Sequence, residues 1–236
     1  MKILAIESAT SASSVAIGRG GNVEAMSLQV DRRGHVGFLV PAIDFCFERA
    51  GWVPTDLDAV AVDVGPGPYS GIRAGVAAAQ AIAASVGVPV ITLSSLTLLA
   101  WRAATGRRRI WPVVDVRRGQ VATRPYLPVP GGVVPDGPAE IVTPDEFRGI
   151  LAADGEETLV VGDWQALPEG LLRAMHTVKK GRPRYPAADV MLEVAAMRAG
   201  AGEFAGPEDI RPLYMRDPDA RINWTQFRHE GLWETP

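Results

Sequence analysis

The stretch that most constrains this chain is a glycine- and proline-rich loop between a strand-like run and an alanine-rich run. The loop spans residues 65–75 and reads GPGPYSGIRAG. Residues 57–64 before it are mostly apolar over the length of a strand, and residues 76–86 after it contain six alanines and no helix breaker. The order strand, glycine loop, helix predicts an α/β fold, and the backbone N–H groups at such a helix start favour anions.

The spacing of the glycines leaves the role of the loop open. No Lys-Ser or Lys-Thr pair follows them, so this is not a Walker loop, and Ser70 stands where the Rossmann fingerprint needs its third glycine. A tight turn without a ligand and a loop that holds a phosphate or a protein are equal alternatives. The loop residues that such a site would use are Gly65, Gly67, Ser70, Gly71 and Arg73.

A hydroxyl-rich turn near the start of the chain could complete a phosphate site with the glycine loop. Residues 2–7, 14–18 and 23–30 are predicted strands, and the first is uniformly apolar, as in a central buried strand. Glu7 ends this strand, and Ser8 and Thr10 follow it in the turn SATSASS. The turn is either a simple polar hairpin or a phosphate cradle that works with the glycine loop.

Two helices of the first half carry a predicted contact face. Residues 35–50 have apolar side chains on two faces, so one face can lie on a sheet while the other needs a neighbour. In the helix after the glycine loop, small residues recur every four positions and allow close helix approach. The two helices either pack on each other within one subunit or join a bundle shared between subunits. The residues predicted for the shared face are Val36, Leu39, Val40, Ile43, Gly75, Ala79 and Ala83.

The basic run at residues 105–109 predicts a boundary between a first α/β lobe at 1–105 and a smaller, degenerate lobe with a C-terminal helix and tail at 106–236. Both halves open with strands and continue with a helix and a strand, which indicates two similar lobes from a weak duplication. The strands expected from residue 89 onwards are 89–93, 111–116, 120–126 and 158–161. The helices expected there are 94–104, 143–153 and 186–201, with a proline- and glycine-rich loop at 128–138.

Composition excludes several classes of protein. The net charge of −3 gives no general attraction to nucleic acid. Cys46 is the single cysteine, so no intrachain disulfide can form, and it is predicted to be a small buried hydrophobe rather than a reactive thiol. Glu7 interrupts any signal-peptide core, and the longest apolar run is too short to span a membrane. A cytoplasmic location is therefore expected.

Residues that could carry catalysis are sparse. The three histidines are His35, His176 and His229, without the paired spacing of a metal site, and no G-x-S-x-G elbow occurs. No metal site is therefore expected, and His35 is predicted to be a hydrogen-bonding residue at a helix start. Asp63, Asp115 and Asp163 fall near strand ends, where they are either turn residues or kinase-like carboxylates.

The glycine loop resembles the GPGSFTGLRIG signature of the TsaB family, the YeaZ-like glycoprotease homologues. Residues 1–10, 14–17 and 35–43 also match that family, and residues 115–118 and 212–216 are similar to its internal DARR and late PxYLR motifs. The chain departs from the pattern at Val36, where the family usually has Ser. It also departs at residues 68–70, which are Pro-Tyr-Ser here and Ser-Phe-Thr in the family signature. The resemblance implies a fold of the actin, sugar-kinase and heat-shock ATPase type.

The resemblance also implies a function. Members are noncatalytic subunits of the complex that forms N6-threonylcarbamoyladenosine at position 37 of tRNAs reading ANN codons, with TsaD and TsaE as partners. It implies a homodimer when the chain is alone, indirect contact with tRNA, no cofactor of its own, no peptidase activity, and ATP or ADP at the joint interface. The residues leave open an autonomous small-molecule kinase or ATPase that uses Glu7 and the 65–75 loop, and a metallopeptidase.

Overall fold

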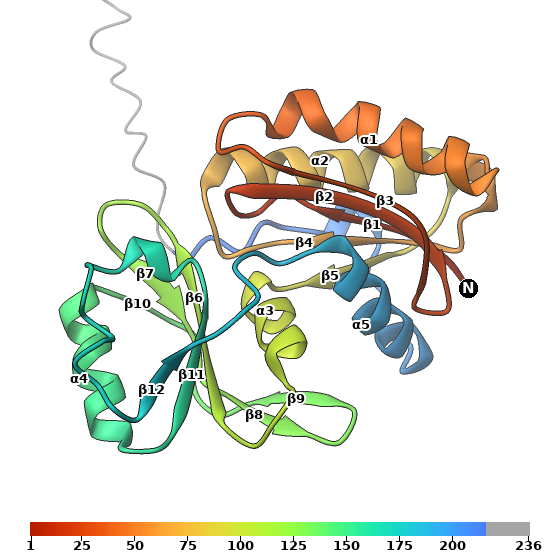
Figure 1. Cartoon of the computed structure of the whole chain (residues 1–236). Coiled ribbons are helices and arrows are strands. Elements are labelled where there is room, and N and C mark those ends of the chain that lie inside the picture. Colours follow the sequence, from red (N-terminus) through yellow and green to blue (C-terminus); the bar gives the residue numbers. More distant parts are fainter. Residues whose placement is uncertain (216–236) are drawn as a thin grey trace, which may run out of the picture.

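The structure, a computed structural model, describes residues 1–215 of the 236-residue chain and shows an α/β protein with two β-sheets (Figure 1). The first sheet has the order β3-β2-β1-β4-β5, with β1 parallel to β4 and antiparallel to β2. Its strands are β1 (Lys2–Glu7), β2 (Ala12–Arg19), β3 (Asn22–Val30), β4 (Ala59–Asp63) and β5 (Val90–Leu93). The uniformly apolar β1 is central and buried, as predicted.

Helices cover both faces of this first sheet (Figure 1). The helices are α1 (His35–Ala50) and α2 (Tyr69–Val86) on one face, and α3 (Ser95–Ala103) and α5 (Ala188–Gly200) on the other. Successive side chains of a strand point to opposite faces, so Leu4 and Ile6 pack under α1 and α2, while Ile3 and Ala5 pack under α5.

The predicted bounds of α1 are confirmed at both ends, whereas α2 begins seven residues earlier than expected. Gly51 ends α1 in the left-handed conformation, with a φ of 67°. The early start of α2 places Ser70 and Gly71 of the glycine loop inside the first turn of the helix. The strand, glycine loop and helix therefore follow in the predicted order, with a shorter loop.

The second sheet has the order β10-β7-β6-β11-β12, and β8 pairs with β6 and β9. Its strands are β6 (Arg109–Asp115), β7 (Val121–Thr123), β8 (Tyr126–Val129), β9 (Gly132–Pro135), β10 (Glu140–Val142), β11 (Thr158–Gly162) and β12 (Val178–Lys180). Helix α4 (Pro144–Asp154) packs on it and starts with a capping box between Thr143 and Glu146, so the expected capped helix is confirmed. Short 3₁₀ turns occupy Pro54–Asp56, Trp164–Ala166 and Pro207–Asp209.

Two expectations for the second half were wrong. The proline- and glycine-rich stretch at 128–138 was expected to be a loop, but it contains most of the β8–β9 hairpin. Pro128 and Pro135 are tolerated there because an outlying two-strand ribbon has ladder positions that need no N–H donor. The strand expected at 120–126 is two strands, β7 and the start of β8.

Helix α5 lies on the first sheet, although the predicted boundary at residue 105 assigns it to the second lobe. The backbone N–H of Ala188 donates to Ser14 Oγ at 2.9 Å, and Met191 and Leu192 are buried against β1 and its neighbours. Residues 188–200 therefore belong by packing with the first sheet, while the boundary at residue 105 stays a prediction. Within residues 1–215, no helix is both long and apolar enough to cross a bilayer.

Candidate functional site

Two acidic side chains end neighbouring strands of the first sheet. Glu7 is the last residue of β1 and Asp63 is the last residue of β4, and the two strands run parallel, so both carboxyl groups lie at the same edge. Both side chains are buried. This edge is where a ligand of an open α/β sheet would sit.

Hydrogen bonds and burial fix the state of this pair. Glu7 Oε1 accepts from the N–H of Ala9 at 2.8 Å, while Glu7 Oε2 has no partner within the described residues. Asp63 accepts from the N–H of Gly65 at 2.8 Å and from the hydroxyl of Ser95 at 2.7 Å. Burial raises the pKa of Asp63 to about 7, and burial together with the charge of Asp63 raises the pKa of Glu7 well above its usual value. The pair therefore favours protonated forms over two free charges.

The glycines of the loop allow the turn after β1 to approach α2 closely. A Cβ atom on Gly67 would lie 1.7 Å from the carbonyl oxygen of Ala9, and one on Gly71 would lie 2.1 Å from the carbonyl oxygen of Ser8. One on Gly75 would lie 2.5 Å from Ser8 Oγ, which donates a hydrogen bond to the carbonyl of Gly71 at 2.8 Å. Close backbone contact thus accounts for these glycines, and the phosphate-loop interpretation stays a prediction.

The other predicted loop residues are dispersed. Gly65 has a φ of 107° that favours glycine, and Ser70 is exposed. Thr10 lines a small pocket away from Glu7. Arg73 donates from Nε to Tyr214 Oη and from Nη2 to Tyr69 Oη, each at 2.9 Å. The sequence missed these tyrosine contacts, and the only signal for Tyr214 was its place in the late family-like motif, whose Arg216 lies outside the described residues.

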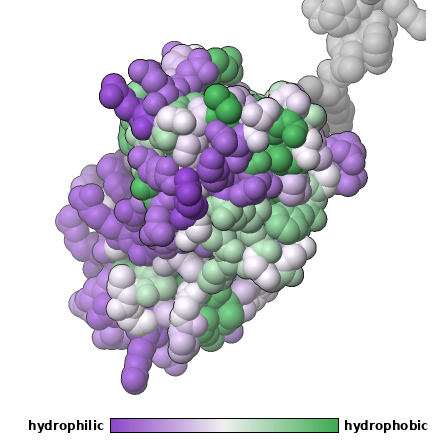
Figure 2. All heavy atoms as spheres, turned by 90° about the vertical axis from the view of Figure 1, so that its right-hand side faces the viewer, coloured by the Kyte–Doolittle hydropathy of each residue, from purple (hydrophilic) through white to green (hydrophobic). Residues whose placement is uncertain are grey.

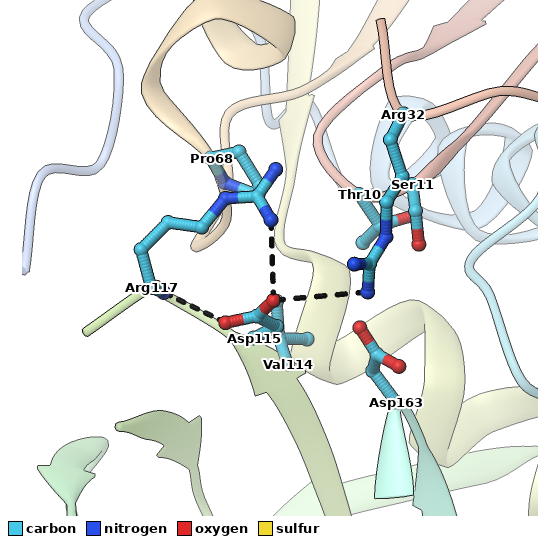
Figure 3. Close-up of a pocket in the computed structure, with 8 residues that line it drawn as sticks. All are labelled: Thr10, Ser11, Arg32, Pro68, Val114, Asp115, Arg117 and Asp163. Carbon is cyan, nitrogen blue, oxygen red and sulfur yellow. Dashed lines mark hydrogen bonds and ion pairs between the residues drawn. The ribbon is translucent and has the colours of Figure 1, made fainter. Parts of the chain in front are cut away.

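A small pocket lies between the two sheets (Figure 3). Its cavity volume is about 10 Å³, and its lining comes from both halves of the chain. The lining residues are Thr10, Ser11, Arg32, Pro68, Val114, Asp115, Arg117 and Asp163. The two strand-end carboxylates Asp115 and Asp163 are thus brought together, as a site would require, whereas Asp63 lies apart beside Glu7.

Two arginine side chains line this pocket and pair Asp115 (Figure 3). Asp115 accepts from the backbone N–H of Arg117 at 2.7 Å, and its other oxygen lies 3.5 Å from Arg117 Nη1 and 3.9 Å from Arg32 Nη2. Burial, and then the charge of Asp115, raises the pKa of Asp163. Across residues 1–215, no group of three or more His, Cys, Asp or Glu side chains is arranged to hold a metal.

The predicted contact face needs a correction. Leu39, Ile43, Gly75, Ala79 and Ala83 are buried in this chain's own core, because the two helices pack on β1, β2 and β4 with those residues. Their side chains are taken up by this chain's own packing.

Two of the seven predicted contact residues face solvent. Val36 is 75% exposed and Val40, one helical turn later, is 63% exposed. Figure 2 shows separate hydrophobic spots among hydrophilic side chains on the upper part of the molecule, where α1 and α2 lie. The exposed apolar side chains near this end are scattered over two elements: Val36, Val40 and Phe45 lie on α1, and Val23, Leu28 and Val30 lie on the edge strand β3.

The interpretations of the lone histidine and cysteine are confirmed. His35 is the first residue of α1, it is buried, and its Nδ1 lies 2.7 Å from Ser13 Oγ in a hydrogen bond. Cys46 is fully buried beside the carbonyl of Val15, and burial raises the pKa of its thiol to about 11. A thiol with that pKa stays protonated and is a poor nucleophile. His229 lies outside the described residues.

The two helix-covered sheets and the glycine loop packed against the first strand define the class: a mixed α/β protein with a closed strand-end site. A family model described as TsaD, tRNA N6-adenosine threonylcarbamoyltransferase, matches residues 29–136. The chain is 31% identical to the tRNA threonylcarbamoyladenosine biosynthesis protein TsaB of Escherichia coli, over 92% of this chain and 95% of that protein. It is 33% identical to TsaB of Bacillus subtilis, over 75% of this chain and 73% of that protein.

A solved structure agrees with these relatives. A Pseudomonas aeruginosa protein described as similar to the peptidase YeaZ superposes with a TM-score of 0.78 at 25% identity, covering 91% of this chain and 99% of that one. The chain belongs to the TsaB family. The resemblance drawn from the glycine loop is therefore confirmed.

Proposed function

We propose that this chain is a noncatalytic subunit of the machinery that forms N6-threonylcarbamoyladenosine at position 37 of tRNAs reading ANN codons. Its task is to bind and activate the catalytic subunit TsaD. Membership of the TsaB family supports the pathway, since the Escherichia coli and Bacillus subtilis relatives are named for threonylcarbamoyladenosine biosynthesis. The two α/β sheets are the two lobes of an actin-like fold, the second being degenerate.

The observation that carries the docking role is the exposure of Val36 and Val40 on α1. Both lie on a helix whose remaining large aliphatic residues are buried, and neither is needed by this chain's core. Exposing two valines one turn apart costs solubility without stabilising the monomer. A partner helix packed on this side of α1 would bury both and exclude water.

The glycine loop is packed against the backbone and the pocket carboxylate Asp115 is paired, and both features favour a scaffold over an enzyme. A kinase or ATPase needs an open strand edge with charged carboxylates for magnesium and a bare helix start for phosphate. Here the backbone of residues 8–9 packs against the start of α2, and Arg117 and Arg32 pair Asp115. The chain therefore has no cofactor of its own in this proposal, and ATP or ADP belongs at the joint interface with TsaD.

The remaining partners follow from the same proposal. TsaE joins the complex of this chain and TsaD, and tRNA contacts the assembly chiefly through TsaD, in line with the net charge of −3 here. In the absence of TsaD the α1 face is covered by a second copy, as a homodimer. The complex works in the cytoplasm.

A reconstituted assay tests the proposal. Purified chain, TsaD and TsaE from the same genome are combined with threonylcarbamoyl-AMP and an ANN-decoding tRNA, and the modified nucleoside is measured by mass spectrometry. The full set should modify the tRNA, and neither this chain alone nor the set without it should do so. Modification that proceeds equally well without this chain would refute the scaffold, and magnesium-dependent ATP turnover by the chain alone would favour the kinase alternative.

Matched variants connect the activity to the face. Val40→Glu should abolish co-elution with TsaD and the modification, with the melting temperature within about 2 °C of wild type because the residue is exposed. Val53→Glu, at a 57% exposed valine beyond the end of α1, should leave both intact. Equal loss in both variants would show that the assay responds to any added charge.

A further inference from the structure

Two motifs that are far apart in the sequence meet on the surface beside α2. Arg73 comes from the glycine loop and Tyr214 from the late motif, 141 positions apart, and Arg73 Nε donates to Tyr214 Oη at 2.9 Å. Tyr69, one helical turn before Arg73, accepts from Nη2 at 2.9 Å. The rings of Tyr69 and Tyr214 stack with centroids 4.3 Å apart and an angle of 17° between their planes. We call these three residues the tyrosine–arginine cluster.

The C-terminal segment, residues 205–214, is held firmly enough to present Tyr214. Ala205 exchanges backbone hydrogen bonds with Val90 on the edge strand β5, at 2.8 and 2.9 Å. Gln80 of α2 donates to the carbonyl of Pro207 at 2.9 Å, and Ile210 is buried in the first core. The N–H of Leu213 donates to the carbonyl of Val64 at 2.7 Å. The segment therefore extends the surface of α2 with a fixed aromatic side chain.

The cluster presents unused hydrogen-bond donors. A guanidinium has five N–H groups, and the two bonds to the tyrosines use two of them. Among residues 1–215, no carboxylate lies within 4.0 Å of the Arg73 guanidinium. Arg73 is exposed, and its orientation is fixed by the two hydroxyls. An oriented, unneutralised guanidinium beside tyrosines is the donor arrangement that binds a carboxylate with two parallel hydrogen bonds.

The cluster lies near the start of α2, which neighbours the start of α1. The first turns of α1 and α2 are neighbours, since a Cβ atom on Gly71 would lie 3.5 Å from the ring of His35. Val36 is the residue after His35, so it belongs to the turn of α1 that lies beside α2. Tyr and Arg side chains are enriched among the interface residues that carry most of the binding energy.

We propose that Tyr69, Arg73 and Tyr214 form an anchoring site for an aspartate or glutamate side chain of the protein partner that docks on α1. The site makes docking depend on the C-terminal segment, which supplies Tyr214. This inference rests on the proposed function and adds the polar anchor to its apolar face. A protein carboxylate is favoured over nucleic acid because the cluster holds one cation on a chain of net charge −3, whereas nucleic-acid sites gather several.

Binding to purified TsaD, measured by calorimetry, tests the anchor. Arg73→Gln and Tyr214→Ala should each raise the Kd at least about tenfold, and Arg73→Lys should raise it several-fold because an ammonium cannot form the paired bonds. Arg148→Gln, at an exposed arginine of α4, is the matched control and should leave the Kd within twofold. Raising the salt concentration should weaken wild-type binding more than binding of Arg73→Gln.

The outcomes separate the two proposals. Wild-type chain that fails to bind TsaD refutes the proposed function itself. Wild-type binding with Kd values of Arg73→Gln and Tyr214→Ala within twofold refutes the anchor and leaves the scaffold standing. Melting curves exclude unfolding, and Tyr214→Phe keeps the ring if Tyr214→Ala melts early. If Arg73→Gln loses tRNA binding while TsaD binding is unchanged, the cluster binds nucleic acid and not a protein carboxylate.

Discussion

Glu7 and Asp63 end the adjacent parallel strands β1 and β4, and both carboxyl groups are buried at one edge of the first sheet. Asp63 also accepts a hydrogen bond from Ser95 at the start of α3. The pair therefore connects β1 and β4 to a helix on the face of the sheet opposite α1 and α2. Burial raises the pKa of both carboxyl groups. The stability of the protein should therefore depend on their protonation.

We expect the pair to make the free energy of unfolding fall as the pH rises from about 4 to about 7, because the native state keeps protons that the unfolded chain releases. Glu7→Gln keeps an acceptor for the N–H of Ala9 and removes one ionisation. It should therefore reduce the loss of unfolding free energy with rising pH. Urea unfolding at acidic and mildly alkaline pH measures this, with exposed Glu156→Gln as the control. Identical pH dependence in wild type and Glu7→Gln would contradict the prediction.

The glycines that face the turn after β1 should resist substitution. Gly67→Ala and Gly71→Ala would place a methyl group 1.7 and 2.1 Å from backbone carbonyls, so the turn or α2 must move. Each should destabilise the fold by at least about 2 kcal/mol. Gly37→Ala, in α1 with open space around it, should stabilise by roughly 0.5–1 kcal/mol. Thermal melting of the three variants checks the contrast, and a stable Gly67→Ala would show that the loop adapts.

The sequence predicted the first sheet and its helices well because their signals are local. The periodicity of residues 35–50, the glycine at 51 and the apolar first strand each determine a structure without reference to distant residues. Helix α5 could not be placed in the same way. Its position under β1 depends on long-range packing, such as the bond from Ala188 to Ser14, which no local pattern encodes.

The candidate site was predicted only in part, for a similar reason. Strand-end carboxylates were found from their positions, and Asp115 and Asp163 do share a pocket. Arg32 and Arg117, the partners of Asp115, lie in turns without a periodic signal. On α1 and α2, periodicity identifies apolar faces but does not say which face meets the chain's own sheet, so residues such as Ala79 were assigned to a partner although they are buried.

Burial at Ala79 leads to a prediction about folding rather than assembly. Ala79→Arg should unfold the chain, because the new charge would lie in the core between α2 and β4, at a cost of several kcal/mol. Ala77→Arg, two positions earlier on the exposed side of the same helix, should keep the fold within about 0.5 kcal/mol. Circular dichroism melting distinguishes the two. A folded Ala79→Arg monomer would show that α2 can turn this face outward.

The pocket between the sheets should not hold a nucleotide in the isolated chain. Its cavity volume of about 10 Å³ is far below the roughly 300–1,000 Å³ of small-molecule sites, and Arg117 and Arg32 already pair Asp115, the carboxylate that magnesium would need. Calorimetry with magnesium and ADP should therefore give a Kd weaker than about 1 mM, or −4.1 kcal/mol. Arg32→Ala, which removes the 3.9 Å pair at an exposed arginine, should cost at most about 1 kcal/mol of stability and should widen the opening. Saturable binding of ADP by the wild-type chain in the micromolar range would contradict the closed pocket and revive the kinase alternative.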